Sequence, residues 1–313
     1  MALKDEIIFA LLNTTDYISG EELAKKFGKS RAAVWKSIKS LINEGYEIDA
    51  VTNKGYKLIE NGNIISAPSI KKYINNDIEV IYYPTIDSTN NCCKRLLAEG
   101  RNGEFLVVAE QQSAGRGRQG KSFYSPSGTG VYFSLVLNPL LPLQNAVTAT
   151  TAAAVAVCKA IEKTTDKKPK IKWVNDVYLD GKKICGILTE AITNFEEGIV
   201  TNVIIGIGIN INTDDFPDEV ENAGCLNEKI NRSLLIAEVC NELTKIAKGD
   251  IKSFIDYYRS HSLVIGEKIR FIKNGEATPA TAIAIDETGG LEVELESGER
   301  TVLRSGEISI RKI

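Results

Sequence analysis

The sequence predicts an α+β fold made of three units, because three kinds of apolar pattern follow one another along the chain. Apolar residues recur at helical spacing near the N-terminus, strand-like alternation and long helical stretches fill the middle, and short alternating runs occupy the C-terminal end. A chain of 313 residues also exceeds the roughly 150 residues of a typical domain. We place the units at residues 1–62, 63–262 and 263–313.

Composition narrows the class of protein before any motif is considered. The formal net charge of −3 excludes a globally basic nucleic-acid binder, so any contact with DNA requires a local basic patch. The six cysteines lack C-x-x-C spacing, which argues against a zinc site and a disulfide framework. The apolar runs are too short for a membrane span and the start lacks a signal-peptide pattern. We therefore expect a cytoplasmic protein with no membrane partner.

The N-terminal unit is predicted to be a winged helix. Ser19 stands three residues before Glu22, a capping-box pattern for one helix, and Ser30 is an N-cap candidate for the next. Alternating runs then flank a predicted hairpin turn at residues 53–55. The second helix carries cations and no acid, which favours DNA binding over a merely solvated helix face. The predicted DNA-binding residues are Ser19, Ser30, Arg31, Lys36, Lys39 and Lys54.

The glycine-rich stretch 115–120 matches the dinucleotide pattern G-x-G-x-x-G but lacks its structural context. A strand is predicted before it, at 104–110, whereas Pro126 and the nearby glycines exclude the helix that a Rossmann turn requires. The stretch therefore joins two strands. Arg116 and Arg118 point to the same side of an extended backbone, where they suit a phosphate or carboxylate. A mobile surface loop with solvated arginines is the alternative.

Asp180 and Gly181 predict a tight hairpin. If they occupy the two turn positions, the opposed pairs are Leu179 with Lys182, Tyr178 with Lys183 and Asp176 with Cys185. Period-two alternation then gives one apolar face and one polar face, the latter carrying Lys172, Asp176, Tyr178 and Lys183. We expect the polar face to meet an ionic substrate, with a plain surface salt-bridge cluster as the alternative.

The next predicted strand, 199–211, contains Gly206 and Gly208, which would leave room for a flat ligand. Cations with one or two acids suit phosphoryl or nucleotidyl transfer, which depends mainly on positioning and charge neutralisation. A carboxylate that attacks the α-phosphate of ATP is already ionised at pH 7. Asp176 and the phosphates are expected to share Mg²⁺.

Helices and a small β-unit complete the predicted fold. We expect a long buried helix at 144–164 and two more helices at 232–247 and 251–261. The C-terminal strands, punctuated by turns at 274–275, 289–290 and 297–298, indicate a β-barrel of SH3-like size.

Several motifs together resemble the biotin protein ligases over nearly the whole chain. They are Ser88-Thr89-Asn90, EQQSAGRGRQGKSFYSP, KWVND, DGKKICGIL, GIGIN and GEISIR. The stretch SGEELAKKFGKSRAAVWKSIKSL resembles the winged helix of the bifunctional biotin-operon repressor branch. The resemblance implies a class II synthetase-like ligase core in the central unit. The departures are Val174 in place of a usual proline, Gln119 in place of a frequent arginine, Phe123 in place of a frequent tryptophan, and Phe216 in a loop where a tryptophan often closes over the adenine.

The resemblance also implies site residues. Those for biotin are Ser88, Thr89, Asn90, Gln112, Gly115, Arg116, Gly117, Arg118 and Lys183. Of these, the catalytic cations are Arg116, Arg118 and Lys183. Those for the nucleotide are Lys121, Lys172, Asn175, Asp176, Asn210 and Phe216, with Asp176 also expected at Mg²⁺. In the C-terminal unit, Arg304 and Glu307 are candidates for lining the approach to the site.

The implied reaction joins biotin and ATP into biotinyl-5′-AMP, from which a lysine of the biotin carboxyl carrier protein takes the biotin. The adenylate-loaded protein would form a homodimer on operator DNA. Two alternatives are a ligand-sensing repressor without ligase activity and a lipoate-type acyl ligase. The polar pair Ser88-Thr89 and Gln112 favour a ureido ring over a dithiolane, because a hydrogen-bonding site rejects ligands that leave it unpaired.

Overall fold

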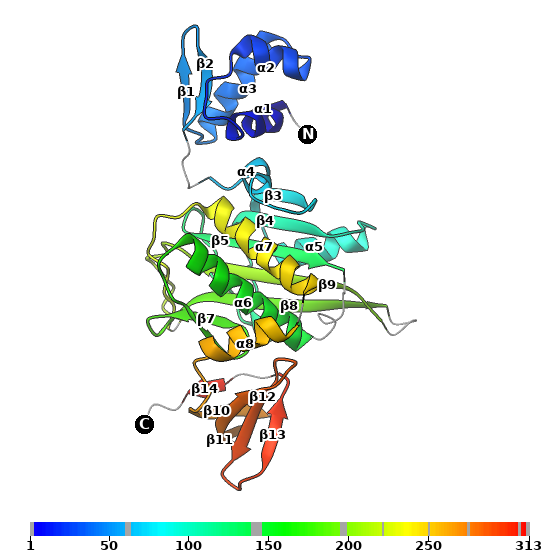
Figure 1. The fold of residues 1–313 in the computed structure, drawn as a ribbon, viewed down its shortest axis with the longest axis vertical. Helices are drawn as coiled ribbons and strands as arrows, with labels where there is room; N and C mark the ends of the chain where they lie inside the picture. The colour runs from blue at the N-terminus through cyan, green and yellow to red at the C-terminus, as the bar shows by residue number, and fades with distance from the viewer. Residues whose placement is uncertain are drawn as a thin grey trace.

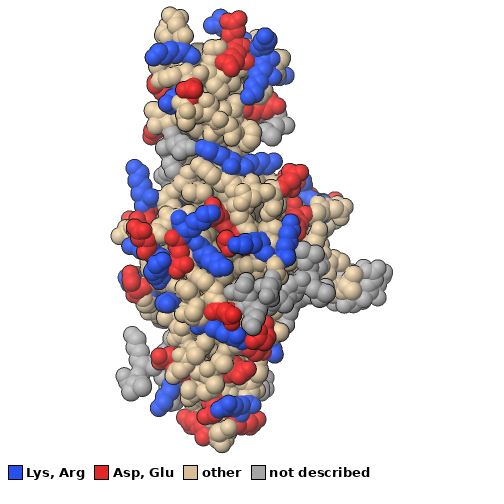
Figure 2. Space-filling model, viewed as in Figure 1, with Lys and Arg blue, Asp and Glu red and all other residues tan. Residues whose placement is uncertain are grey.

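The computed structural model describes residues 3–59, 64–138, 146–194, 199–220, 222–249, 251–273, 276–305 and 308–310. The N-terminal unit, a central seven-stranded sheet with its helices, and a C-terminal five-stranded sheet follow one another along the long axis (Figure 1). Acidic and basic side chains are interspersed over the face seen in Figure 2. Within these ranges, no helix is long and apolar enough to cross a membrane.

The N-terminal unit has the predicted helix-turn-helix and hairpin, with its own apolar core. Ser19 caps α2 by accepting from the Glu22 amide at 3.0 Å, and Ser30 caps α3 in the same way. Gly55 has φ +112° and lies so close to Ile18 that a Cβ would be 2.2 Å from the Ile18 carbonyl oxygen. The elements are α1 Leu3–Leu12, α2 Gly20–Phe27, α3 Arg31–Asn43, β1 Ile48–Val51 and β2 Gly55–Leu58.

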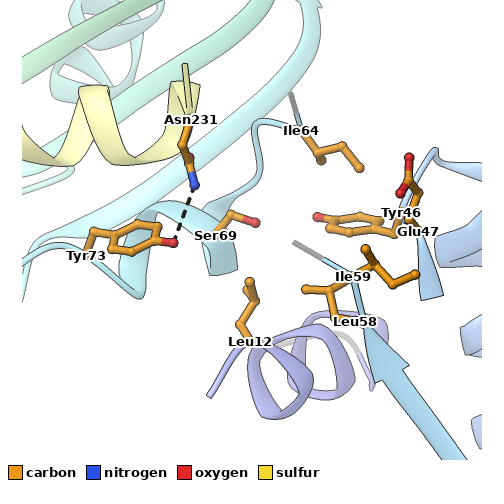
Figure 3. Close-up of a pocket in the computed structure, with 9 residues that line it drawn as sticks. All are labelled: Leu12, Tyr46, Glu47, Leu58, Ile59, Ile64, Ser69, Tyr73 and Asn231. Atoms are coloured by element: carbon orange, nitrogen blue, oxygen red, sulfur yellow. Dashed lines mark hydrogen bonds between the residues drawn. The ribbon is translucent and has the colours of Figure 1, made fainter. Parts of the chain in front are cut away.

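A short helix, α4 Ala67–Lys71, connects the winged helix to the central unit. It packs against α1 and α7. A cavity of about 30 Å³ lies at this junction, lined by residues of both units, with Leu12 and Tyr46 on one side and Asn231 and Tyr73 on the other (Figure 3). Asn231 donates to the Tyr73 hydroxyl at 3.4 Å.

The central sheet is mixed and has the strand order β3-β4-β5-β9-β8-β7-β6. Only β3 and β4 pair in parallel; the other neighbours are antiparallel. The strands are β3 Glu79–Ile86, β4 Phe105–Gln112, β5 Gly130–Leu137, β6 Lys170–Lys172, β7 Asp176–Leu179, β8 Lys182–Asn194 and β9 Ile199–Asn210. The helices are α5 Thr89–Ala98, α6 Ala146–Thr164, α7 Arg232–Lys248 and α8 Ile251–His261.

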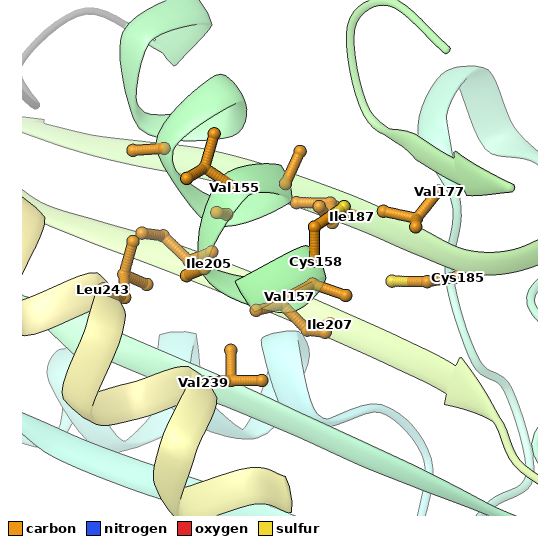
Figure 4. Packing of buried hydrophobic residues seen from close by; sticks show 14 of the residues in the cluster. Val155, Val157, Cys158, Val177, Cys185, Ile187, Ile205, Ile207, Val239 and Leu243 are labelled. Atoms are coloured by element: carbon orange, nitrogen blue, oxygen red, sulfur yellow. The ribbon is translucent and has the colours of Figure 1, made fainter. Parts of the chain in front are cut away.

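Both faces of the central sheet are covered. Along β4, Leu106 and Val108 join the core beneath α6 and α7, whereas Phe105 and Val107 join the smaller core beneath α5. Figure 4 shows the larger core, where side chains of α6 and α7 meet the isoleucines of β8 and β9. The predicted buried helix is confirmed as α6. One face of the sheet is thus filled by long helices, which leaves the α5 face for a site.

The β7–β8 hairpin confirms most of the predicted register and corrects one pair. Leu179 opposes Lys182 and Tyr178 opposes Lys183, but Asp176 pairs with Gly186 instead of Cys185. A β-bulge causes the shift. Ile184 is the extra residue on β8, because Lys183 opposes Tyr178 and Cys185 opposes Val177.

The C-terminal strands form a five-stranded antiparallel sheet in the order β13-β12-β11-β10-β14. In the parts of this unit that are described, β13 and β14 do not pair, so the sheet is open and the SH3-like barrel stays a prediction. Trp173 Nε1 donates to the Gly289 carbonyl at 2.9 Å and links this sheet to the central unit. The strands are β10 Lys268–Lys273, β11 Glu276–Ile285, β12 Leu291–Leu295, β13 Arg300–Leu303 and β14 Ile308–Ile310.

Two side chains of this unit were candidates for lining a site. Arg304 forms an ion pair with Asp286 at 2.7 Å and donates to Thr288, so its guanidinium is held within the C-terminal unit. Glu307 and the turn at 274–275 lie outside the described residues.

Candidate functional site

The glycine-arginine loop lies between two antiparallel strands, as predicted. It leaves β4 and returns as β5, and it contains only a short 3-10 turn, Arg118–Gly120, with no α-helix in the loop. The chain folds back on itself here: Arg116 and Ser122 form a β-bridge, and the Gly117 amide donates to the Lys121 carbonyl at 2.7 Å. A dinucleotide turn is therefore excluded.

The loop and the β7–β8 hairpin meet through a continuous chain of polar contacts. Arg118 donates to the Asn175 Oδ1 at 2.8 Å. The Asn175 amide donates at 3.0 Å to Asp176 Oδ1, which also lies 2.7 Å from Lys183 Nζ. The predicted charged face is thus confirmed, and its lysine and carboxylate are both partly open to solvent. Arg118 and Lys183 thus lie on either side of the Asn175 side-chain amide and the Asp176 carboxylate. Two cations in this arrangement are suited to binding a polyanion.

Arg116 lies on the other side of the loop, against α5, so the prediction that Arg116 and Arg118 point to the same side is wrong, because the backbone turns into the 3-10 segment at Arg118. The Arg116 guanidinium donates to Asn91 Oδ1 at 2.9 Å and lies 3.9 Å from a Glu190 carboxylate oxygen. Lys94 pairs with the same carboxylate at 2.7 Å. Sequence reasoning did not predict Asn91 or Glu190, although Asn91 directly follows the Ser-Thr-Asn motif.

Glu190 is held as an anion by its neighbours. Burial raises the pKa of Glu190. Hydrogen bonds from Lys94 and Asn90 and the charges of Lys94 and Arg116 each lower it, and together they outweigh burial, so the net pKa lies below its ordinary value. A partly buried anion at this point fixes the positions of the groups that donate to it.

The Ser-Thr-Asn motif begins α5 and joins a buried polar network. Ser88 is the N-cap of α5. Thr89 donates from its amide to Gln112 Oε1 at 2.8 Å, and the Gln112 amide nitrogen donates to Ser125 at 2.9 Å. Asn90 accepts from Ser134 at 2.6 Å. The predicted biotin residues of α5 and β4 therefore lie together, and Ser125 and Ser134 complete the network.

Glycines in β8 and β9 form the floor beneath these side chains. A Cβ on Gly206 would lie 2.0 Å from Asn90 Oδ1, and one on Gly208 would lie 2.4 Å from the Phe123 ring. A Cβ on Gly186 would also touch that ring, at 3.1 Å. The prediction that Gly206 and Gly208 leave room for a flat ligand is therefore wrong in detail, because side chains of this chain fill the space.

If Asn90 contacts the substrate as predicted, replacing Gly206 with alanine is expected to raise the KM for that substrate by about tenfold or more, since buried groups lose partners worth roughly 1–3 kcal/mol. The new methyl displaces Asn90 from its bonds to Ser134, Leu188 and Glu190. Steady-state kinetics measure the change. In an Asn90→Ala background the same substitution should add little; a full additive loss there would contradict the steric explanation.

The predicted nucleotide residues lie on several different elements. Asn210 is buried and donates to the Gly224 carbonyl at 3.0 Å, while its Oδ1 has no hydrogen-bond partner. Lys172 lies directly opposite Asp176 in the pairing of β6 with β7, and its Nζ is 5.6 Å from the Tyr178 ring centroid. The Phe216 ring lies edge-on to Tyr124, with centroids 6.4 Å apart. An orphaned buried acceptor needs a donor from outside the chain, either a water or a ligand.

Asp176 is the only acid of the hydrogen-bonded chain that joins the loop to the hairpin. In the ranges that the structure describes, no group of three or more His, Cys, Asp or Glu residues is placed to hold a metal ion. One carboxylate fits Mg²⁺, which is commonly bound through one or two carboxylates and substrate phosphates.

The predicted DNA-binding residues lie at the far end of the molecule, in the winged helix (Figures 1 and 2). Arg31, Lys36, Lys39 and Lys54 are all exposed. Ser19 and Ser30 accept hydrogen bonds as helix caps, which gives their hydroxyl groups a structural role in addition to any contact with DNA.

Comparisons with known proteins agree with one another over most of the chain. The model of the biotin/lipoate A/B protein ligase family matches residues 82–210, an HTH domain model matches 4–57, and the biotin protein ligase C terminal domain matches 264–311. The bifunctional ligase/repressor BirA of Bacillus subtilis is 36% identical over 310 residues and covers 92% of each chain. That of Escherichia coli is 28% identical, covering 97% of this chain and 96% of the relative.

A solved structure is similar as well. The biotin protein ligase from Aquifex aeolicus in complex with biotin and ATP superimposes with a TM-score of 0.62 and 28% identity. The match covers 75% of this chain and 99% of that one.

Proposed function

The chain belongs to the family of bifunctional biotin ligases and repressors, and from this premise we propose the residues, substrates and partners through which it acts. It is a biotin protein ligase whose helix-turn-helix unit has a repressor function. The observation that carries the catalytic assignment is the chain of contacts from Arg118 through Asn175 and Asp176 to Lys183.

In the first step, a biotin carboxylate oxygen attacks the α-phosphorus of ATP. The P–O bond to the β-phosphate breaks, and pyrophosphate leaves with the electron pair. No general base is needed because the carboxylate is already ionised. Arg116, Arg118 and Lys183 exchange their protein acceptors for carboxylate and phosphate oxygens, and they neutralise the charge that develops in the transition state. Catalysis is therefore mainly positioning and charge neutralisation.

The biotin ureido ring binds at the buried polar network. Thr89, Asn90 and Gln112 supply donors and acceptors there, at the start of α5. Gly115 packs against this network, since a Cβ on it would lie 3.1 Å from the Gln112 amide nitrogen. A dithiolane would leave such groups unpaired, which favours biotin over lipoate. The complete biotin set remains Ser88, Thr89, Asn90, Gln112, Gly115, Arg116, Gly117, Arg118 and Lys183.

The nucleotide lies on the hairpin side of the cations. The buried Asn210 Oδ1 accepts from it, and Phe216 packs against the adenine. Asp176 would hold Mg²⁺, which would help to neutralise the phosphate charge. The nucleotide set is Lys121, Lys172, Asn175, Asp176, Asn210 and Phe216.

In the second step, a lysine amine of the biotin carboxyl carrier protein attacks the biotinyl carbonyl, and AMP leaves. When this acceptor is scarce, the adenylate-loaded protein forms a homodimer and binds operator DNA of the biotin operon in the cytoplasm. The C-terminal unit, as an SH3-like barrel, packs beside the ligase core.

A pyrophosphate-release assay tests the ligase function. Purified protein is given ATP and Mg²⁺ with biotin, lipoate or no acid, and the products are then offered to a biotin acceptor domain. We expect release with biotin alone, followed by labelling of the acceptor. Release with lipoate only would favour the acyl-ligase alternative, and release with neither acid would favour a repressor that only senses its ligand.

A further inference from the structure

A tryptophan stands exposed on the basic face of α3. Val34, Ile38 and Leu41 mark the buried side of this helix, whereas Trp35 is 51% exposed. Arg31 and Lys39 are four positions before and after Trp35, so each lies within about 40° of it around the helix axis. Trp35 therefore lies in the middle of a stripe whose two ends are cationic.

The charges around Trp35 have one sign. α3 contains no acidic residue, and Lys36 follows Trp35 directly and is exposed. Lys39 Nζ lies 4.2 Å from the centroid of the Trp35 ring. An apolar ring framed by cations complements duplex DNA, in which base edges lie between two rows of phosphates.

We propose that Trp35 is the specificity-determining residue of this winged helix and packs its ring on a thymine methyl group in the major groove of duplex DNA. The proposal rests on the DNA-binding function proposed above. Arg31, Lys36 and Lys39 bind phosphates, which positions the helix but carries no sequence information directly, whereas an apolar contact with a base edge does.

Selection from duplex DNA with a randomised central stretch provides the probe, using the full chain with biotin, ATP and Mg²⁺. On the selected sequence, Trp35→Ala should weaken binding about tenfold or more, with the salt dependence unchanged because no phosphate contact is lost. Lys36→Ala should instead reduce the slope of log K against log salt by about one. Ile42→Ala, which removes another exposed apolar side chain of α3, is the matched control and should bind normally.

A second measurement isolates the methyl contact. Each thymine of the selected sequence is replaced in turn by deoxyuridine. At one position in each half of the selected sequence, loss of the thymine methyl group should weaken wild-type binding about fourfold, because burying one CH₂-sized group contributes that much affinity. The same replacement should not affect binding by Trp35→Ala. Alanine is a better helix former than tryptophan, and an unchanged circular-dichroism spectrum and thermal unfolding of the variant check that the winged helix is folded.

The outcomes separate the proposal from the function on which it rests. If the wild-type chain enriches no sequence, DNA binding itself fails, and the proposal with it. If the wild type binds a selected sequence and Trp35→Ala binds it equally well, or the uracil effect persists in that variant, Trp35 does not read the sequence although DNA binding stands. Tryptophan fluorescence gives a third measurement. The chain has two tryptophans, and Trp173 is buried, so a DNA-dependent fluorescence change present in wild type and absent in Trp35→Phe supports the contact.

Discussion

Replacing Lys183 with alanine is expected to slow biotinyl-adenylate synthesis by about 10²–10³-fold, the usual effect of removing one preorganised group that stabilises developing charge. The Lys183 ammonium lies 2.7 Å from Asp176 and is joined through Asn175 to Arg118, so it is already positioned before substrates arrive. Biotin-dependent exchange of labelled pyrophosphate into ATP measures the adenylation step alone.

Lys182→Ala is the matched control for this prediction. It removes the same charge from the adjacent residue, whose exposed side chain packs beside Gly224. Adenylate synthesis should remain close to normal in this control. The fold should survive in Lys183→Ala too, because a partly exposed ion pair contributes only about 0–1 kcal/mol to stability. Near-normal exchange by a folded Lys183→Ala protein would refute the assigned role.

Reversing two charges on α3, with Arg31→Glu and Lys36→Glu together, is expected to weaken operator binding by at least about a hundredfold and to flatten its salt dependence. Each phosphate that a protein neutralises contributes about 0.9 to the slope of log K against log salt, and the substituted carboxylates repel the same phosphates. Both side chains are exposed and far from the ligase site (Figure 1). Binding isotherms at several salt concentrations give the affinity and the slope.

Biotin transfer to an acceptor domain is the internal control for the charge-reversed protein. The winged helix has a hydrophobic core separate from that of the central sheet, so ligation should be unaffected. A ligation defect would mean that the two units are coupled through their junction at α4 and the cavity beside Tyr46. Unchanged DNA binding would remove α3 from the DNA-binding surface.

The sequence by itself determined which elements form, because their signals are local. Ser19 and Ser30 mark helix starts and Gly28 marks a helix end, where it adopts φ +62°. Asp180 and Gly181 form the turn of a hairpin. The alternation of side chains along the two strands then puts Asp176 and Lys183 on the same face of the hairpin. The absence of a helix after the glycine-arginine loop also follows from local residues, and it was enough to exclude a dinucleotide turn.

Only the tertiary structure decided which side chains meet across the sheet. Asn90 and Glu190 are 100 residues apart in the sequence, yet they share a hydrogen bond of 2.9 Å, and Gly206 makes room for Asn90 instead of a ligand. A bulge in β8 also shifts Asp176 to a position opposite Gly186. Such contacts depend on strand order and register, which are set by the packing of the whole core and leave no mark on the neighbouring residues of the chain.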